Sequence, residues 1–159
     1  MSLLLRTALF TVLIPGTVTV AVPYVLLRSH IDCAIGISPA LRMFGLLPLS
    51  AGITVYLWCA WEFATAGRGT PAPYDPPQLL VTRGLYTVSR NPIYIGVVLI
   101  ILGEALLVDS IPLLGYALLL LALFHARVVL YEEPRLHSTF GGEYERYCLT
   151  VPRWVPHLR

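Results

Sequence analysis

The sequence predicts an all-α, polytopic membrane protein with about four transmembrane helices and a short amphipathic tail helix. Hydrophobic residues make up 57% of the 159 residues and charged residues only 13%, about half the usual charged share of soluble proteins. Three apolar stretches, residues 3–27, 41–63 and 93–131, are each long enough to cross a bilayer, which takes about 20 helical residues. We expect residues 1–159 to form a single domain.

The first two apolar stretches predict two N-terminal spans within residues 1–63. The first is longer than the apolar region of a signal peptide, about 7–15 residues, and no small-x-small cleavage site follows it. We therefore expect a retained anchor rather than a signal peptide. Pro15 and Pro23 predict kinks in this helix, which membrane helices tolerate where neighbours satisfy the freed carbonyl groups.

The third apolar stretch is too long for one crossing and is interrupted by Asp109-Ser-Ile-Pro112. Proline suits the first turn of a helix, and Asp or Ser just before it suits the N-cap. The sequence therefore predicts a helical hairpin of residues 93–108 and 112–131. Gly96 is a small residue that is expected to allow close helix approach within this hairpin.

Four crossings place the N-terminus, the connection of residues 64–91 and the C-terminal tail on one side of the membrane. That side carries Arg68, Arg83, Arg90, Arg135, Arg146, Arg153 and Arg159. The opposite side carries only Arg28 and Arg42. Positive residues mark the cytoplasmic face. We expect a multi-pass protein of a bacterial or archaeal type inner membrane, with both termini and any active site in the cytoplasm.

Composition also bounds the ligands. A net charge of +2 is too small to indicate a nucleic-acid partner. The three cysteines are dispersed and the four histidines form no metal-binding motif, so we predict no metal site. No GxGxxG sequence follows a strand, which excludes a soluble Rossmann-type cofactor domain. The sequence does not specify an oligomeric state.

Polar residues concentrate in the segment Arg83-Gly-Leu-Tyr-Thr-Val-Ser-Arg-Asn-Pro-Ile-Tyr-Ile-Gly96, directly before an apolar run. Anchoring a helix does not require so many, and the pattern favours binding of a polar or charged ligand. The Gly- and Pro-rich residues 67–77 that precede it predict a loop. This loop is either a solvated connector or a rim over a pocket.

The hairpin brings further polar residues to the same depth. In an antiparallel pair turning near Ser110, residues whose numbers sum to about 221 lie level. Tyr94 therefore lies level with Arg127, and Arg90 with Tyr131. His125 and Glu132, seven residues apart, are expected on nearly the same helix face. Arginine and tyrosine are also ordinary interface anchors, but the adjacent pair Glu132 and Glu133 serves no anchoring purpose.

Two other features each leave two interpretations open. Phe140, Tyr144 and Tyr147 recur at helical spacing and predict a short amphipathic helix, which either anchors the tail or covers a pocket. Glu104 lies inside a predicted span, where carboxylates are costly and often functional. It either has a catalytic role or lies near enough to the far surface to reach water or a local partner.

Taken in order, these motifs resemble the isoprenylcysteine carboxyl methyltransferase and phospholipid methyltransferase superfamily. The resemblance rests on Arg90-Asn-Pro-x-Tyr-x-Gly96, Glu132-Glu133 with Leu136, Phe140-Gly-x-Glu-Tyr-x-x-Tyr147 and Val151-Pro-Arg-Trp-x-Pro156. It covers residues 78–156, about half of the chain. It implies an integral membrane enzyme that transfers a methyl group from S-adenosyl-L-methionine. The family usually has histidine at the position of Asn91.

Carried over residue by residue, the resemblance also implies the site. The implied cofactor contacts are Gln78, Leu79, Leu80, Val81, Tyr86, Arg90, Asn91, Pro92, Ile93, Tyr94 and Glu132. Arg127 lies near the family's substrate-side arginine, and Glu133 lies one residue from the glutamate match; both are expected to be catalytic. The chemistry agrees, since arginine pairs with a carboxylate, glutamate binds ammonium or hydroxyl groups, and tyrosine faces attract a sulfonium.

The methyl acceptor is not specified. A prenylated cysteine carboxylate, a phospholipid amine or another lipophilic small molecule fits, and it would enter from the membrane lipids. An amine acceptor would need a base, for which Glu133 or His125 is the candidate. Two other classes compete: an NADPH-dependent membrane reductase that binds phosphate through Arg68, Arg83 and Arg90, and a non-catalytic four-helix membrane protein.

Overall fold

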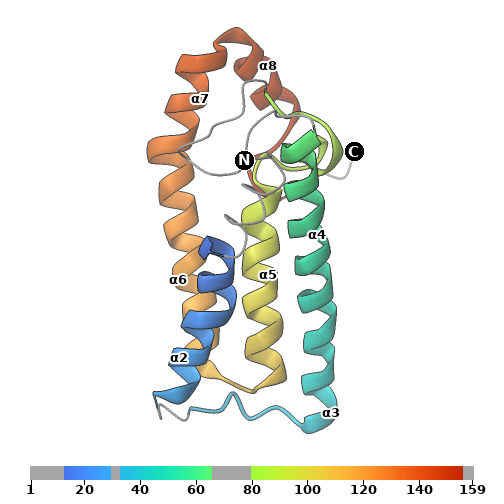
Figure 1. The fold of residues 1–159 in the computed structure, drawn as a ribbon, viewed down its shortest axis with the longest axis vertical. Coiled ribbons are helices and arrows are strands. Elements are labelled where there is room, and N and C mark those ends of the chain that lie inside the picture. Colours follow the sequence, from blue (N-terminus) through green and yellow to red (C-terminus); the bar gives the residue numbers. More distant parts are fainter. Residues whose placement is uncertain (1–12, 30–32, 66–79, 156–159) are drawn as a thin grey trace.

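The structure is a computed structural model that describes residues 13–29, 33–65 and 80–155, and Figure 1 shows its fold. Within these ranges the regular backbone is helical, apart from one isolated antiparallel bridge between Ala34 and Ser110. The prediction of an all-α protein is confirmed. The start of the first predicted span and the predicted loop at residues 67–77 lie outside the described residues.

The bounds of the helices are η1 (Thr17–Ala21), α2 (Val22–Arg28), α3 (Pro39–Arg42), η2 (Met43–Gly45), α4 (Leu46–Thr65), η3 (Gly84–Thr87), α5 (Pro92–Leu107), α6 (Ile111–Arg127), η4 (Val128–Glu132), α7 (Glu133–Phe140) and α8 (Gly142–Thr150). The helices of the C-terminal half follow one another with short connections, from α5 through α8. Figure 1 shows α2, α4, α5 and α6 running side by side along the long axis, with α7 continuing the column of α6 and α8 folding back over that end.

The predicted hairpin is present. α5 ends at Leu107 and α6 begins at Ile111, and the Ser110 side chain caps α6 by accepting a hydrogen bond from the Leu113 N–H at 3.4 Å. Asp109 occupies the turn with a φ of 57°, a conformation that aspartate adopts more readily than most residues. Its carboxylate pairs with Arg42 at 2.7 Å, which ties the turn to the start of the neighbouring helix.

The closest approach of α5 is to α4, and glycines make it possible. A Cβ added at Gly52 would lie 2.6 Å from the Gly96 carbonyl oxygen, and one added at Gly96 would lie 3.0 Å from the Gly52 oxygen. Gly45 and Gly103 form a second such contact, seven positions from Gly52 and Gly96 along their helices. Gly96 therefore does allow close packing, but the expectation that it packs within the hairpin is wrong, because its glycine-lined face is turned to α4.

Both π-helical turns immediately precede a proline. The Val22 N–H bonds the Thr17 carbonyl before Pro23, and the Glu133 N–H bonds the Val128 carbonyl before Pro134. A proline ring collides with the carbonyl four residues earlier, and a wider turn with bonds five residues back relieves the collision. The second π turn, η4, lies where the long helix enters the α7 region and sets the direction of the side chains that follow.

The surface of the bundle matches a membrane environment. Two helical segments, Pro39–Phe63 and Ile111–Phe140, are long and apolar enough to cross a bilayer, and Leu13–Arg28 and Pro92–Leu107 are shorter apolar helices. Leu118, Leu119, Leu121, Leu123 and Leu130 are exposed large apolar residues of the long α6–η4 segment. Apolar groups exposed to this extent favour lipid as the surroundings.

Candidate active site

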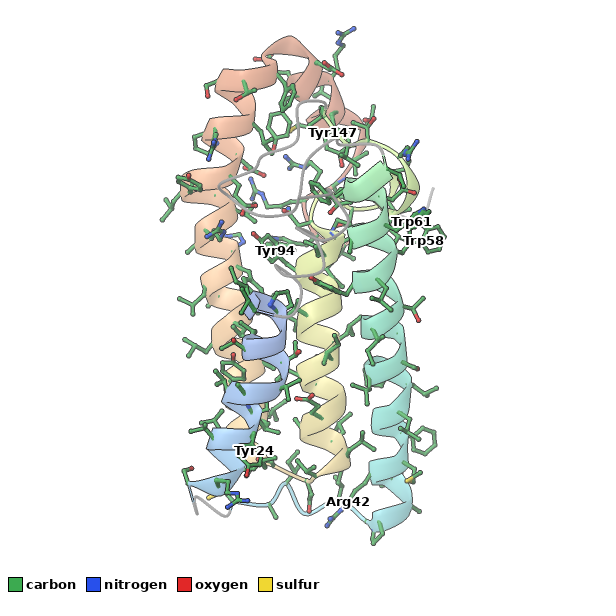
Figure 2. The ribbon with its side chains drawn as sticks, viewed as in Figure 1. Tyr24, Arg42, Trp58, Trp61, Tyr94 and Tyr147 are labelled. Atoms are coloured by element: carbon green, nitrogen blue, oxygen red, sulfur yellow. The ribbon has the colours of Figure 1, made fainter. Side chains whose placement is uncertain are left out.

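A cavity of about 400 Å³ lies at the end of the bundle where α5 begins and where α7 and α8 fold over. This volume falls within the usual range for small-molecule sites. Figure 2 places Tyr94 and Tyr147 at this end, and Tyr24 and Arg42 at the other. The lining residues are Phe63, Leu80, Val81, Tyr86, Arg90, Asn91, Ile93, Tyr94, Arg127, Val128, Tyr131, Glu132, Glu133, Arg135, Leu136, Thr139, Phe140, Tyr144 and Tyr147.

Three of these residues form one hydrogen-bonded group across the hairpin. The Tyr94 hydroxyl donates to Glu132 Oε1, and Arg127 Nε donates to the same oxygen at 2.7 Å and to the Tyr94 hydroxyl at 3.2 Å. The Tyr94 ring stacks on Phe124 with centroids 4.5 Å apart. The predicted register of Tyr94 with Arg127 is therefore confirmed, and the stacking fixes the phenol that orients the carboxylate.

The second glutamate is held by two arginines. Arg153 Nε and Nη2 donate to the two Glu133 oxygens at 2.7 and 2.8 Å. Arg90 Nη1 lies 3.0 Å from Glu133 Oε1. The Glu133 and Arg90 side chains are largely buried, at 18% and 13% exposed. A pair of this kind is strongly coupled, because removing one partner leaves the other charge buried.

Arg90 has one further pair of contacts and one free group. Its Nη1 also donates to the Tyr144 hydroxyl at 3.3 Å and to Cys148 Sγ at 2.8 Å. Its Nε is buried and has no hydrogen-bond partner within the described part of the chain. An unsatisfied donor on a buried cation is costly. Arg90 as a residue lines the cavity, so its guanidinium contributes positive charge to the cavity wall.

The apolar end of the cavity is closed by aromatic residues of the tail. Tyr144, Tyr147 and Val151 form a buried cluster, and the Tyr147 hydroxyl donates to the Tyr86 carbonyl at 2.7 Å. Burial raises the pKa of Tyr86, Tyr144 and Tyr147 above the ordinary value of 10.0. These phenols are therefore neutral at physiological pH and act as hydrogen-bonding and stacking surfaces.

Most of the residues expected from sequence meet at this cavity. Those that line it are Leu80, Val81, Tyr86, Arg90, Asn91, Ile93, Tyr94, Arg127, Glu132 and Glu133. Pro92 is the buried first residue of α5 and does not line the cavity. Gln78 and Leu79 lie outside the described residues.

Several lining residues were not predicted as site residues. They are Phe63, Val128, Tyr131, Arg135, Leu136, Thr139, Phe140, Tyr144 and Tyr147. For Phe140, Tyr144 and Tyr147, the helical spacing in the sequence could have indicated a place in the site. The structure shows that these three residues line the pocket. His125, expected on the face of Glu132, does not line the cavity; it accepts a hydrogen bond from Trp154 Nε1 at 3.1 Å. The intervening π turn changes the helical phase between the two positions.

Two other sequence candidates also lie apart from the cavity. Arg83 pairs with Glu62 at 2.6 Å and donates to Thr65 at 2.9 Å. Glu104 does not line the cavity, and its Oε2 is buried without a hydrogen-bond partner within the described residues. The local partner expected for that oxygen is thus not found there. Among the same residues, no group of His, Cys, Asp and Glu has the arrangement of a metal site.

The donor set indicates the kind of ligand that the cavity suits. Two carboxylates and three arginines lie at its polar side, and phenyl and phenol rings with Leu80 and Val81 form its apolar side. Such a mixture suits an organic molecule that carries both a positive and a negative group together with an aromatic ring. It does not resemble a site for an inorganic ion.

Comparisons with known proteins point in the same direction. A family model described as phospholipid methyltransferase matches residues 41–143. A cobalt-zinc-cadmium resistance protein, CzcN, of Cupriavidus metallidurans is 30% identical over 77% of this chain and 52% of its own length. A protein-S-isoprenylcysteine O-methyltransferase of Schizosaccharomyces pombe is 38% identical over 49% of this chain and 33% of its own length. The chain thus spans about half or less of the length of these relatives.

One solved structure also shares the fold. The eukaryotic intramembrane Ras methyltransferase, an isoprenylcysteine carboxyl methyltransferase, matches with a TM-score of 0.61 over 90% of this chain and 52% of that chain, at 23% sequence identity. At this identity the match shows a shared fold.

Proposed function

Because the chain belongs to the phospholipid methyltransferase family, we propose that it transfers a methyl group from S-adenosyl-L-methionine to a lipophilic acceptor at the cytosolic membrane face. The observation that carries the proposal is the cavity in which Glu132, Tyr94 and Arg127 form one hydrogen-bonded group beside Arg90. Family membership supports the methyltransferase class. The cofactor and the acceptor class are inferred from the chemistry of this cavity.

The residues present fit S-adenosyl-L-methionine. Arg90 lines the cavity, and its guanidinium is a cation that suits the carboxylate of the cofactor. Glu132 is a carboxylate acceptor for its ammonium or ribose hydroxyls. The aromatic residues Phe140 and Tyr144 supply faces for the adenine and attract a cationic sulfonium. When bound, the cofactor supplies an electrophilic methyl group.

The chain's own residues contribute orientation and enclosure. Tyr94 and Arg127 hold the Glu132 carboxylate in one direction, since both bond its Oε1. The α7–α8 cap and its tyrosines restrict water over the cavity. Methyl transfer from a sulfonium neutralises charge, and a dry site favours that loss, while fixed alignment contributes most of the remaining acceleration.

The acceptor is proposed to be lipophilic and to enter from the bilayer. Apolar side chains such as Leu123 and Leu130 are exposed on the segment that carries Arg127 and Glu132. An isoprenylcysteine-like carboxylate or another lipid-like small molecule fits this arrangement. A carboxylate or thiolate acceptor needs no strong base, so Arg127 is proposed to position the acceptor or the cofactor rather than to move a proton.

The membrane arrangement belongs to the same proposal. We propose four crossings, counting the shorter apolar helices Leu13–Arg28 and Pro92–Leu107, with the cavity at the end that carries most of the arginines. That end is proposed to face the cytoplasm, in a bacterial or archaeal type inner membrane. Residues 1–159 then act as one unit in which residues 78–156 bind the cofactor and residues 1–63 supply the two N-terminal spans.

The alternative functions have less support. An NADPH-dependent reductase was expected to bind phosphate through Arg68, Arg83 and Arg90. Arg83 is paired with Glu62 and does not line the cavity, and Arg68 lies outside the described residues. A non-catalytic scaffold does not account for the carboxylates and arginines that gather in one cavity of this size. We therefore favour the methyltransferase.

Calorimetric titration of the detergent-purified full chain tests the proposal. The titrants are S-adenosyl-L-methionine, S-adenosylhomocysteine and NADPH. We expect micromolar binding of the first two, weakened about tenfold or more in Glu132→Gln, because a hydrogen bond to a charged group contributes about 1.5–3 kcal/mol. The matched control is Glu143→Gln, since Glu143 is exposed on α8 and does not line the cavity. Binding of NADPH alone would indicate a reductase, and no binding at all would indicate a scaffold.

A further inference from the structure

The segment after α8 is hydrogen-bonded to residues 89–91, which directly precede α5 and are called the motif below. We call residues 151–153 the C-terminal strap. The Arg90 N–H donates to the Pro152 carbonyl at 2.9 Å. The Arg153 carbonyl accepts from Ser89 Oγ at 3.2 Å and from Asn91 Nδ2 at 3.1 Å. Three successive motif residues therefore bond a segment about sixty positions later in the chain.

A side-chain clamp reinforces these main-chain bonds. The guanidinium of Arg153 reaches both oxygens of Glu133, at 2.7 and 2.8 Å, in the bidentate geometry that gives arginine–carboxylate pairs their strength and direction. Glu133 Oε1 also faces Arg90 Nη1 at 3.0 Å. The hydrogen bonds to Glu133 raise the pKa of Arg153 above its ordinary value, so Arg153 carries its positive charge. One carboxylate thus joins the strap, the first residue of α7 and the motif.

Arg153 does not line the cavity, whereas Arg90 and Glu133 do. Its side chain is 36% exposed, compared with 18% for Glu133 and 13% for Arg90. Arg153 can therefore influence a ligand in the cavity only through the residues that it holds. Removing its charge would leave Glu133 with Arg90 alone and would release the strap side chain from α7.

From these contacts we propose that Arg153 is a positioning residue for cofactor binding: through Glu133 it keeps the C-terminal strap closed and Arg90 fixed in the cavity wall. The proposal rests on the proposed function, because it concerns affinity for S-adenosyl-L-methionine. It also assigns Glu133 to the same clamp. Three N–H groups of Arg153 and Arg90 lie at the Glu133 oxygens, which is the arrangement of an ion-pair partner that holds both arginines.

A double-mutant cycle on affinity for S-adenosylhomocysteine tests the proposal. The variants are Arg153→Gln, Glu133→Gln and the double variant, all as full-length chains in detergent. We expect each single variant to weaken binding by roughly 10- to 100-fold, since small misplacements of binding groups have effects of that order. The double variant should bind within about twofold of Glu133→Gln, because coupled residues are not additive.

Two further variants separate positioning from general damage. Arg153→Lys keeps the charge near Glu133 but loses the bidentate fork, and it should recover most of the affinity. Arg146→Gln is the matched control, because Arg146 is exposed and its Nε bonds only the Gly142 carbonyl of its own helix. It should bind as the wild type does. Thermal melting of each variant shows that binding is measured on folded protein. If Arg153→Gln does not fold, Arg153→Lys is compared directly with the wild type: loss of the bidentate fork should weaken binding measurably, and affinity equal to that of the wild type would overturn the positioning role.

The outcomes distinguish this inference from the proposed function. Unchanged affinity in Arg153→Gln, with affinity lost in Glu132→Gln, would overturn the positioning role and leave the methyltransferase intact. Additive losses in the double variant would also overturn it, since Arg153 and Glu133 would then act independently. A wild-type chain that binds neither S-adenosyl-L-methionine nor S-adenosylhomocysteine would overturn both.

Discussion

The close approach of α4 and α5 at Gly52 and Gly96 predicts that a larger residue at position 52 lowers the unfolding free energy, and the structure gives the size of that loss. A Cβ at Gly52 would meet the Gly96 carbonyl oxygen at 2.6 Å and the Ile100 nitrogen at 2.7 Å. Ordinary van der Waals contact begins at 3.4 Å. Both neighbours are backbone atoms that cannot rotate away. The substitution Gly52→Ala therefore forces the two helices apart by up to roughly 0.8 Å, and overpacking of this kind costs about 1–3 kcal/mol.

The same geometry ranks three substitutions. Gly96→Ala should cost less than Gly52→Ala, since its Cβ would lie 3.0 Å or more from its neighbours. Gly115→Ala is the matched control, because a Cβ at Gly115 on α6 meets nothing within 4 Å. Alanine also has a helix propensity better than that of glycine by about 1 kcal/mol. Gly115→Ala should therefore leave stability unchanged or raise it.

Unfolding in mixed micelles with a rising fraction of sodium dodecyl sulfate measures these differences. Trp58 and Trp61 lie on α4, exposed on the outside of the bundle (Figure 2), and their fluorescence reports separation of α4. We expect the order Gly115→Ala, then Gly96→Ala, then Gly52→Ala, from most to least stable. Equal midpoints for Gly52→Ala and Gly115→Ala would refute the reasoning, because the close approach of α4 and α5 would then not limit the size of the residue at position 52.

Contacts at the two ends of the molecule predict two further outcomes. Asp109→Ala removes the acceptor of Arg42 and of two main-chain N–H groups, so it should lower the unfolding free energy by about 1.5–3 kcal/mol; Asp109→Asn, which also tolerates a φ of 57°, should lie between it and the wild type in the same micelle titration. The pKa values of Tyr144 and Tyr147 are raised in the folded protein. Burial of the neutral phenols therefore contributes its full stability below the unfolded pKa of about 10. This stability is lost as the pH rises from there through the folded pKa. Melting temperature against pH, with tyrosinate absorbance, measures this loss, and a melting temperature that stays constant above about pH 10 would contradict it.

The hairpin and its register were predictable because local signals determine them. Asp109, Ser110 and Pro112 mark the turn within four residues, and the rise per residue of a helix then places Tyr94 level with Arg127. The contact of Tyr94 with Arg127 follows from that level. Glu132, which bonds both residues, was expected near Asn91 by the same register and was identified as a site residue by the family resemblance.

The remaining features depend on contacts that no local pattern specifies. A small residue at Gly96 predicts close packing but not the helix that it packs against. The partner is α4, because Gly52 lies there and lets the two backbones approach. The π turn before Pro134 shifts the phase between His125 and Glu132. The partners of Glu133 come from positions 90 and 153, and such distant pairings cannot be read from spacing.

The arginines that indicate membrane orientation also form ion pairs at the cavity end. Arg83, Arg90 and Arg153, three of the arginines that indicate the cytoplasmic side, are each paired with a glutamate at the cavity end. Arg42, at the opposite end, is paired as well. Orientation depends on counts of positive residues and little on carboxylates, whereas the site depends on which carboxylate each arginine meets. Replacing Arg153 alone leaves the excess of arginines on the cavity side intact. A loss of ligand affinity in that variant therefore reflects the opened clamp and not an inverted protein.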